Sequence, residues 1–220
     1  MRISPTAFLW LNALGFQAVW WAWAWGAPTG QALWPALGSV LFLALHFAGT
    51  PDPRRDTLSV GLCVVVGFLF DTAMMQADWL RFASPNRAPF DGVQPLWMMA
   101  LWTSLACTLH TSLGWLQRWP VGIYAVCAVM GWLSYEAADR LGALTLADSV
   151  GGVVALLVGV TGTILVFGSN IGAPSKVLAG VLAVLTSFAA SYSAFSLKSP
   201  LSRASAIALV MRGRSSCFIK

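Results

Sequence analysis

The sequence predicts an all-α protein, a polytopic transmembrane helical bundle with six spans and a possible seventh. Of its 220 residues, 58% are hydrophobic and only 10% are charged, and the mean hydropathy is +0.73. A soluble domain with so little charge would need a largely apolar surface. The apolar residues also form continuous runs, separated by short polar joints, and about 20 apolar residues span a ~30 Å hydrocarbon layer. These observations predict a chain that folds inside a membrane.

Charge and cysteine content argue against two kinds of site. The net charge of +5 comes from basic residues in the joints and the tail, as membrane topology requires, so it does not indicate a nucleic-acid partner. The four cysteines contain no CxxC pair, and buried cysteines commonly act as small apolar residues. We therefore expect neither a metal site nor a bound cofactor.

The first two spans are expected at Ala7–Gly26 and Leu33–Gly49. Tryptophans crowd the far end of the first run, where indole rings prefer the boundary between water and lipid. The joint between the runs is short and uncharged, so the two helices should form an antiparallel hairpin. A cleaved signal peptide is the alternative for the first run, but the run is too long and too rich in tryptophan for that.

The third span, Thr57–Ala77, carries a carboxylate. Cys63, Gly67 and Asp71 are spaced by four, which places Asp71 on a row where another helix can pack closely. A carboxylate facing lipid would cost at least ~2.5 kcal/mol, so Asp71 should face inward. The following joint, residues 78–94, mixes aromatic and charged residues and is typical of a segment lying on the membrane surface.

The fourth run, Pro95–Leu116, carries His110 among small polar residues. On one continuous helix, Thr103, Cys107 and Gly114 would share the face of His110. An ionisable group on the inward face of a membrane helix is a functional candidate by default. The alternative is a histidine that only forms a hydrogen bond to a neighbouring helix.

Two further spans are expected at Trp119–Ala138 and Ser149–Gly168. Residues 1–168 would then form the transmembrane bundle, and residues 169–220 a serine-rich extension with a basic tail. Val177–Leu197 could be a seventh span, or it could lie at the interface.

The distribution of arginines favours a cytoplasmic N-terminus, since Arg54 and Arg55 then lie inside. A seventh span would place the basic tail outside, against the same rule.

Helix rise places the polar groups in two layers roughly 10 Å apart. The inner layer holds Asn12, His46 and His110, and the outer layer holds Asp71, Tyr135, Glu136 and Arg140. Asp71 and His110 are therefore not expected to form a direct pair.

Each layer has a functional interpretation and a simpler one. Two histidines from adjacent spans can ligate haem iron, but we favour His46 at the headgroup level. The outer carboxylates could form a proton or cation pathway, but we favour a solvated helix end for Glu136, Asp139 and Arg140. No sequence motif names a reaction, and His110, Ser112 and Asp71 are the catalytic candidates.

Four stretches, taken together and in order, resemble a known family over about residues 5–165. They are LNALGFQAVWWAWAWG, GFLFDTAMMQADWLRF, PLWMMALWTSLACTLHTSLGWL and SYEAADRLGAL. The chain resembles the uncharacterised proteobacterial membrane family catalogued as domain of unknown function 2878. The positions singled out within the matching stretches are Asn12, Asp71, Trp97, His110, Ser112, Tyr135 and Arg140. The serine-rich end departs from the family pattern.

The resemblance implies a small protein of the bacterial inner membrane. It also implies an accessory role in membrane-lipid modification, because members are often encoded beside lipid-modifying enzymes such as cyclopropane-fatty-acid-synthase-like methyltransferases. We expect membrane lipids and such enzymes as partners, and a role without catalysis. The alternatives are a small proton-coupled transporter using Asp71 and Glu136, and a membrane-embedded enzyme centred on His110.

Overall fold

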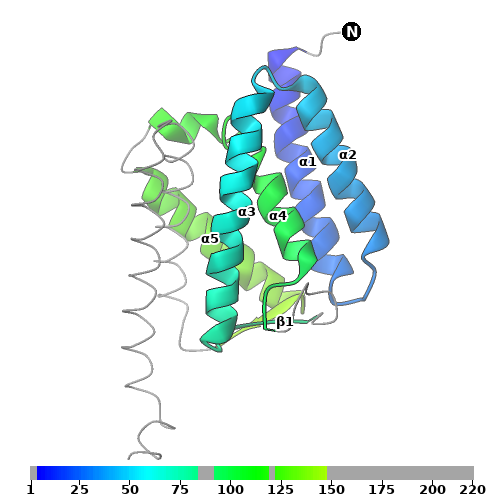
Figure 1. The fold of residues 1–220 in the computed structure, drawn as a ribbon, viewed down its shortest axis with the longest axis vertical. Coiled ribbons are helices and arrows are strands. Elements are labelled where there is room, and N and C mark those ends of the chain that lie inside the picture. Colours follow the sequence, from blue (N-terminus) through cyan, green and yellow to red (C-terminus); the bar gives the residue numbers. More distant parts are fainter. Residues whose placement is uncertain (1–3, 84–91, 119–121, 148–220) are drawn as a thin grey trace, which may run out of the picture. The chain divides into compact units, whose positions relative to one another are not determined.

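The computed structural model describes residues 4–83, 92–118 and 122–147, which form a mainly helical unit (Figure 1). The all-α prediction therefore holds for this part of the chain, apart from one small sheet that the sequence did not predict. The elements are α1 (Pro5–Gly26), α2 (Leu33–Gly49), α3 (Pro53–Gln76), β1 (Leu80–Phe82), α4 (Leu96–Ala106), the 3-10 helix η2 (Gly114–Arg118), α5 (Gly122–Arg140) and β2 (Leu144–Leu146). The predicted spans Ser149–Gly168 and Val177–Leu197 lie outside the described residues, as does the extension after residue 168.

Helices α1 and α2 form the expected hairpin, and α2 has the predicted bounds. Helix α1 begins where the Ser4 side chain accepts a hydrogen bond from the backbone N–H of Ala7, a common N-cap. At the other end of α1, a Cβ on Gly26 would lie 2.5 Å from the carbonyl oxygen of Gln31. Glycine at this position therefore lets the chain reverse closely into α2.

Helices α3 and α4 pack closely through the row that the sequence indicated. Cys63 and Asp71 are fully buried on this row. Between them, Gly67 lies against the indole ring of Trp102 from α4, at a position where any Cβ would overlap the ring. The prediction that this row of α3 receives another helix is confirmed.

Helix α4 is much shorter than predicted, because it ends at Ala106 and not at Leu116. From Cys107 onward, the backbone forms turns, and the Thr111 hydroxyl lies 2.6 Å from the carbonyl oxygen of Cys107. Threonine side chains that bind nearby carbonyl groups compete with the helical ladder. His110 therefore does not share a helix face with Thr103, Cys107 and Gly114, and that part of the prediction is wrong.

A short antiparallel ladder joins two segments far apart in the sequence. Strand β1 follows α3 and pairs with β2, which follows α5, so that Arg81 lies opposite Thr145. The segment after α3, predicted to lie on the membrane surface, therefore begins with a strand. The ladder holds the last turn of α3 near the end of α5.

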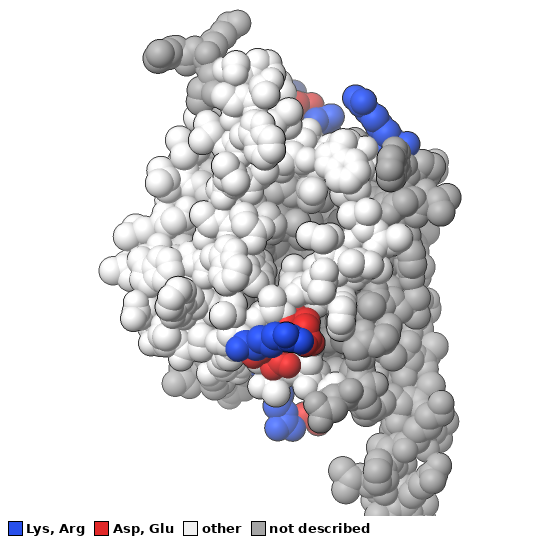
Figure 2. Space-filling view, turned by 180° about the vertical axis from the view of Figure 1, so that it is seen from behind, with Lys and Arg blue, Asp and Glu red and all other residues white. Residues whose placement is uncertain are grey.

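The described residues are apolar on the outside and carry polar groups inside. Trp10, Leu33 and Leu58 are 64%, 75% and 76% exposed, whereas Asp71 is 0% and His46 2% exposed. Figure 2 shows charged side chains towards the two ends of this unit, with an uncharged surface between them. Helix α3 is long and apolar enough to cross a membrane, and α2 and α4 are shorter apolar helices.

The close approach at Gly67 gives a test of the α3–α4 contact. Gly67→Ala should lower stability by about 1–3 kcal/mol, because the added methyl group must displace the buried indole ring of Trp102. Gly61→Ala is the matched control on the same helix, since nothing lies within 4 Å of its Cβ position. Thermal unfolding of the purified protein in detergent would measure both. Equal melting temperatures for the two variants would contradict the packing described here.

Candidate functional site

The buried polar residues form two separate clusters. The His46 cluster consists of Asn12, His46, Thr50, Asp56, Thr111 and Ser112. The Asp71 cluster consists of Asp71, Trp102 and Tyr135.

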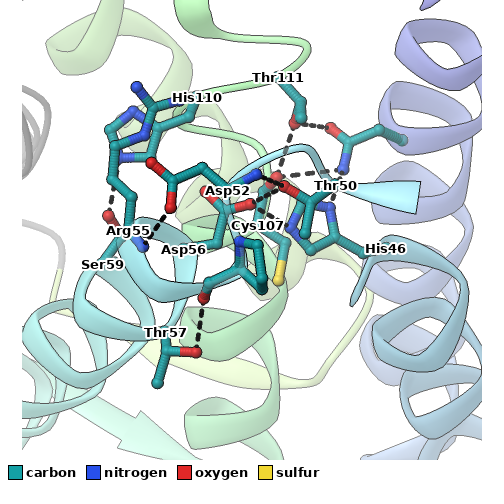
Figure 3. A network of polar contacts seen from close by, with 12 residues as sticks. His46, Thr50, Asp52, Arg55, Asp56, Thr57, Ser59, Cys107, His110 and Thr111 are labelled. Carbon is teal, nitrogen blue, oxygen red and sulfur yellow. Dashed lines mark hydrogen bonds and ion pairs between the residues drawn. The ribbon is translucent and has the colours of Figure 1, made fainter. Parts of the chain in front are cut away.

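His46 lies at the centre of the first cluster (Figure 3). Its Nε2 is 3.0 Å from a carboxylate oxygen of Asp56, and its Nδ1 is 3.2 Å from the amide nitrogen of Asn12. The Thr50 hydroxyl donates to the same oxygen of Asp56 over 2.5 Å. The ring lies between Phe8 and Phe42, with ring centroids 5.9 Å and 6.4 Å away. Side chains from α1, α2 and α3 therefore all contact the His46 ring.

Two backbone groups fix the orientation of the Asn12 side chain. Its amide nitrogen lies 3.1 Å from the Cys107 carbonyl oxygen, which can only accept, and its oxygen faces the Ser112 N–H at 3.4 Å, which can only donate. The Ser112 hydroxyl donates to the same oxygen over 2.7 Å. Because the amide nitrogen donates, Nδ1 of His46 must accept, and the proton of the neutral ring lies on Nε2, facing Asp56.

This arrangement leaves His46 no free ring nitrogen. Both nitrogens are bonded and the residue is 2% exposed, so acid–base chemistry or metal ligation would first require Asp56 or Asn12 to leave. A haem held by His46 and His110 would need the same rearrangement. The geometry favours a structural role in which His46 ties three helices together.

His110 belongs to a different contact. Its Nε2 lies 2.8 Å from the Ser59 hydroxyl oxygen of α3, whereas the Ser112 hydroxyl donates to Asn12. A serine hydroxyl beside an imidazole has the form of an activated nucleophile. However, Ser59 is only 2% exposed, so a substrate would have to displace neighbouring side chains to reach it.

Asp71 lies in the second cluster, where three helices meet. The Trp102 indole N–H donates to one carboxylate oxygen over 2.6 Å and the Tyr135 hydroxyl to the other over 2.5 Å. The Phe70 ring contacts both aromatic rings edge-on, at 6.4 Å and 6.3 Å. Within the described part of the chain, both bonding partners of this buried carboxylate are neutral.

Glu136 and Arg140, predicted in the same outer layer as Asp71, bond to each other, while Asp71 bonds to Trp102 and Tyr135. The Arg140 guanidinium lies 3.0 Å from the Glu136 carboxylate at the exposed end of α5. Arg81 pairs with Asp78, 3.2 Å away. Asp71 and Glu136 therefore belong to two different contacts, an Asp71–Tyr135 bond and an ion pair at the end of α5.

Thr103 and Cys107, the remaining candidates, make local contacts. The Thr103 hydroxyl donates to the Met99 carbonyl one turn earlier, and Cys107 contributes its backbone carbonyl to the His46 cluster. In the described residues, no group of three or more His, Cys, Asp or Glu side chains could hold a metal ion.

A small cavity borders the Asp71 cluster. Its volume is about 30 Å³, which is far below the several hundred Å³ of a drug-sized ligand site. Its lining is mostly aromatic and aliphatic and comes from α1, α4, α5 and β2: Trp20, Ala24, Trp97, Met98, Leu101, Ser134, Tyr135, Ala138 and Leu144. The cavity has room for water rather than for a substrate.

Sequence reasoning missed several partners, among them Asp56, Ser59 and Trp102. The joint between α2 and α3 offered a signal for Asp56. A joint this short places the last turn of α2, with His46, beside the first turn of α3, with Asp56. Trp102 could not be found in this way, because an indole on an apolar helix is more often part of the core than the partner of a carboxylate.

The Asp56–His46 bond gives a test of the His46 cluster. Asp56→Ala should lower stability by about 3–5 kcal/mol, because it leaves the Nε2–H of His46 and the Thr50 hydroxyl buried with no acceptor. Glu136→Ala is the matched control, since it removes a carboxylate from an ion pair at the surface and should change stability little. Thermal unfolding in detergent compares the two variants. A similar loss in both would mean that the buried bond adds nothing.

Comparison with known proteins places the chain in a family. No curated protein and no solved structure matches it. The family described as protein of unknown function (DUF2878) matches residues 9–167, which is more than half of the chain and covers all of the residues in both clusters. The chain belongs to the DUF2878 family.

Proposed function

We propose that this chain is a multi-pass integral protein of the bacterial inner membrane. The observation that carries the proposal is the large apolar outer surface, together with carboxylates that are buried inside the bundle. Large residues such as Trp10 and Leu58 face outward, 64% and 76% exposed, while Asp56 and Asp71 are 1% and 0% exposed. Water would penalise such a surface, whereas lipid favours it.

The charged residues support one orientation. The first turn of α3 carries Arg54 and Arg55 and lies at the same end of the bundle as the start of α1 (Figure 1). Cytoplasmic segments carry an excess of arginine and lysine. We therefore place this end, and with it the N-terminus, in the cytoplasm.

Within the membrane, we assign the protein a non-catalytic, accessory role beside membrane lipids or lipid-modifying enzymes. Both ring nitrogens of His46 and both carboxylate oxygens of Asp71 are already bonded within the protein. Saturated polar groups of this kind support a structural scaffold more than a reaction centre. The enzyme centred on His110 has less support, because Ser112 points to Asn12.

Membrane fractionation and lipid analysis test this assignment. The protein should remain in the membrane pellet after an alkaline carbonate wash, and deletion of the gene should change the lipid composition of the cell. Restoring His110→Ala should rescue the wild-type lipid profile, because the role does not use His110 in catalysis. Release by carbonate would overturn the membrane assignment, and an unchanged lipidome after deletion would overturn the lipid assignment.

A proton-coupled carrier is the second candidate, and Asp71 is the observation that favours it. A carboxylate buried in an apolar helix with only neutral donors is costly to retain and commonly marks a proton pathway in carriers. Glu136 no longer supports this candidate, since it pairs with Arg140 at the helix end.

The carrier candidate predicts the effect of one substitution. Asp71→Asn should abolish proton-coupled flux in proteoliposomes while the protein stays folded, because the amide keeps the shape but cannot exchange a proton. Asp78→Asn is the control at an exposed position, where asparagine also tolerates the backbone φ of 57°. Flux of protons or solute that Asp71→Asn leaves unchanged would exclude the carrier.

A further inference from the structure

The arginines at the two ends of the described unit differ in their partners. At the end formed by β1 and the last turn of α5, Arg81 is paired with Asp78 and Arg140 with Glu136. At the opposite end, Arg54, Arg55 and Arg118 are all exposed, and none of their guanidinium groups has a hydrogen bond or ion pair within the described ranges. These three residues form the basic end of the unit.

One contact and the arrangement of the helices place the three arginines at the same end. Arg54 and Arg55 lie in the first turn of α3, and Arg118 closes η2. The bond between His110 and Ser59 holds the turn that leads into η2 beside the first turns of α3. Figure 1 also places η2 and the start of α3 at the same end.

The carboxylates near the basic end do not neutralise it. Asp56 is buried and accepts hydrogen bonds from His46 and Thr50. One Asp52 oxygen accepts from the backbone N–H of Arg55, and its carboxylate forms no ion pair within the described ranges. Within the described ranges, this end therefore has three exposed guanidinium groups and one exposed carboxylate, whereas Arg81 and Arg140 at the other end each have a carboxylate partner.

We propose that the basic end binds the headgroup of an anionic phospholipid. This proposal rests on the proposed membrane location, in which the basic end lies at the cytoplasmic headgroup layer. A guanidinium group presents several N–H donors in a fork that matches two phosphate oxygens, and basic groups at this depth attract anionic lipids. The exposed apolar residues that begin just below, such as Leu58 on α3 and Trp115 on η2, suit the acyl chains of the same lipid.

The full chain, purified in a neutral detergent, can be titrated with phosphatidylglycerol and with phosphatidylcholine of the same acyl chains. Native mass spectrometry would count the bound lipids. The wild type should prefer phosphatidylglycerol at least tenfold, and Arg54→Gln, Arg55→Gln and Arg118→Gln should each reduce that preference about fivefold. High salt should reduce it further, because ion screening weakens exposed charge pairs.

Arg81→Gln and Arg140→Gln are the matched controls, since they remove arginines that already have carboxylate partners. They should leave the preference unchanged. Equal binding of the two lipids by the wild type, or an equal loss in the control variants, would overturn the headgroup site. Competition by inorganic phosphate at millimolar concentration, without any lipid preference, would assign the arginines to a soluble anion and would also overturn it.

The carbonate wash separates this proposal from the membrane assignment. A protein that stays in the pellet but shows no preference for phosphatidylglycerol would contradict only the headgroup site. A protein released by carbonate would remove the premise of both.

Discussion

The bond between His46 and Asp56 determines how the first three helices can meet. Every polar atom of an ionisable pair inside an apolar bundle needs a hydrogen-bond partner, because a buried polar atom without one lowers the stability of the fold and apolar packing does not compensate for it. Asp56 satisfies one side of the imidazole and Asn12 the other, so α1, α2 and α3 can approach only in the register that brings these atoms together. The turn after α4 is held to the same point through the Cys107 carbonyl. The polar interior thereby supplies a specificity that apolar contacts alone do not.

The Asp71 cluster satisfies a carboxylate by different means. Its donors are an indole and a phenol, each rigid and large, and their rings pack around Phe70. Aromatic donors provide a hydrogen bond and apolar surface at once, so the cluster needs no cation. The two clusters thus join overlapping sets of helices, with α3 in both, and leave the outer surface apolar.

Much of the fold followed from the sequence because apolar runs set helix length and short joints set antiparallel pairing. The bounds of α2 and the close-packed row of Cys63, Gly67 and Asp71 were predicted from spacing alone. The prediction failed at α4, where hydropathy remained high beyond Ala106. There the hydroxyl groups of Thr108 and Thr111 donate to the backbone carbonyls of Leu105 and Cys107, and the helix ends. Hydropathy reports transfer to lipid and carries no information about which hydrogen bonds the backbone will choose. The separate contacts of Asp71 and Glu136 were missed for another reason. Helix rise gives the depth of a residue along the helix but not the neighbour that its side chain faces.

Asn12 has a consequence for proton movement through this bundle. A continuous line of hydrogen bonds runs from Asp56 through His46 and Asn12 to the hydroxyl of Ser112, and in outline it resembles a wire. An imidazole can take a proton on one nitrogen and release it from the other, but a carboxamide nitrogen only donates and has no lone pair to receive the next proton. Asn12 therefore interrupts proton transfer between His46 and Ser112. The bundle can therefore hold ionisable groups in a hydrogen-bonded chain at this end without conducting protons along it.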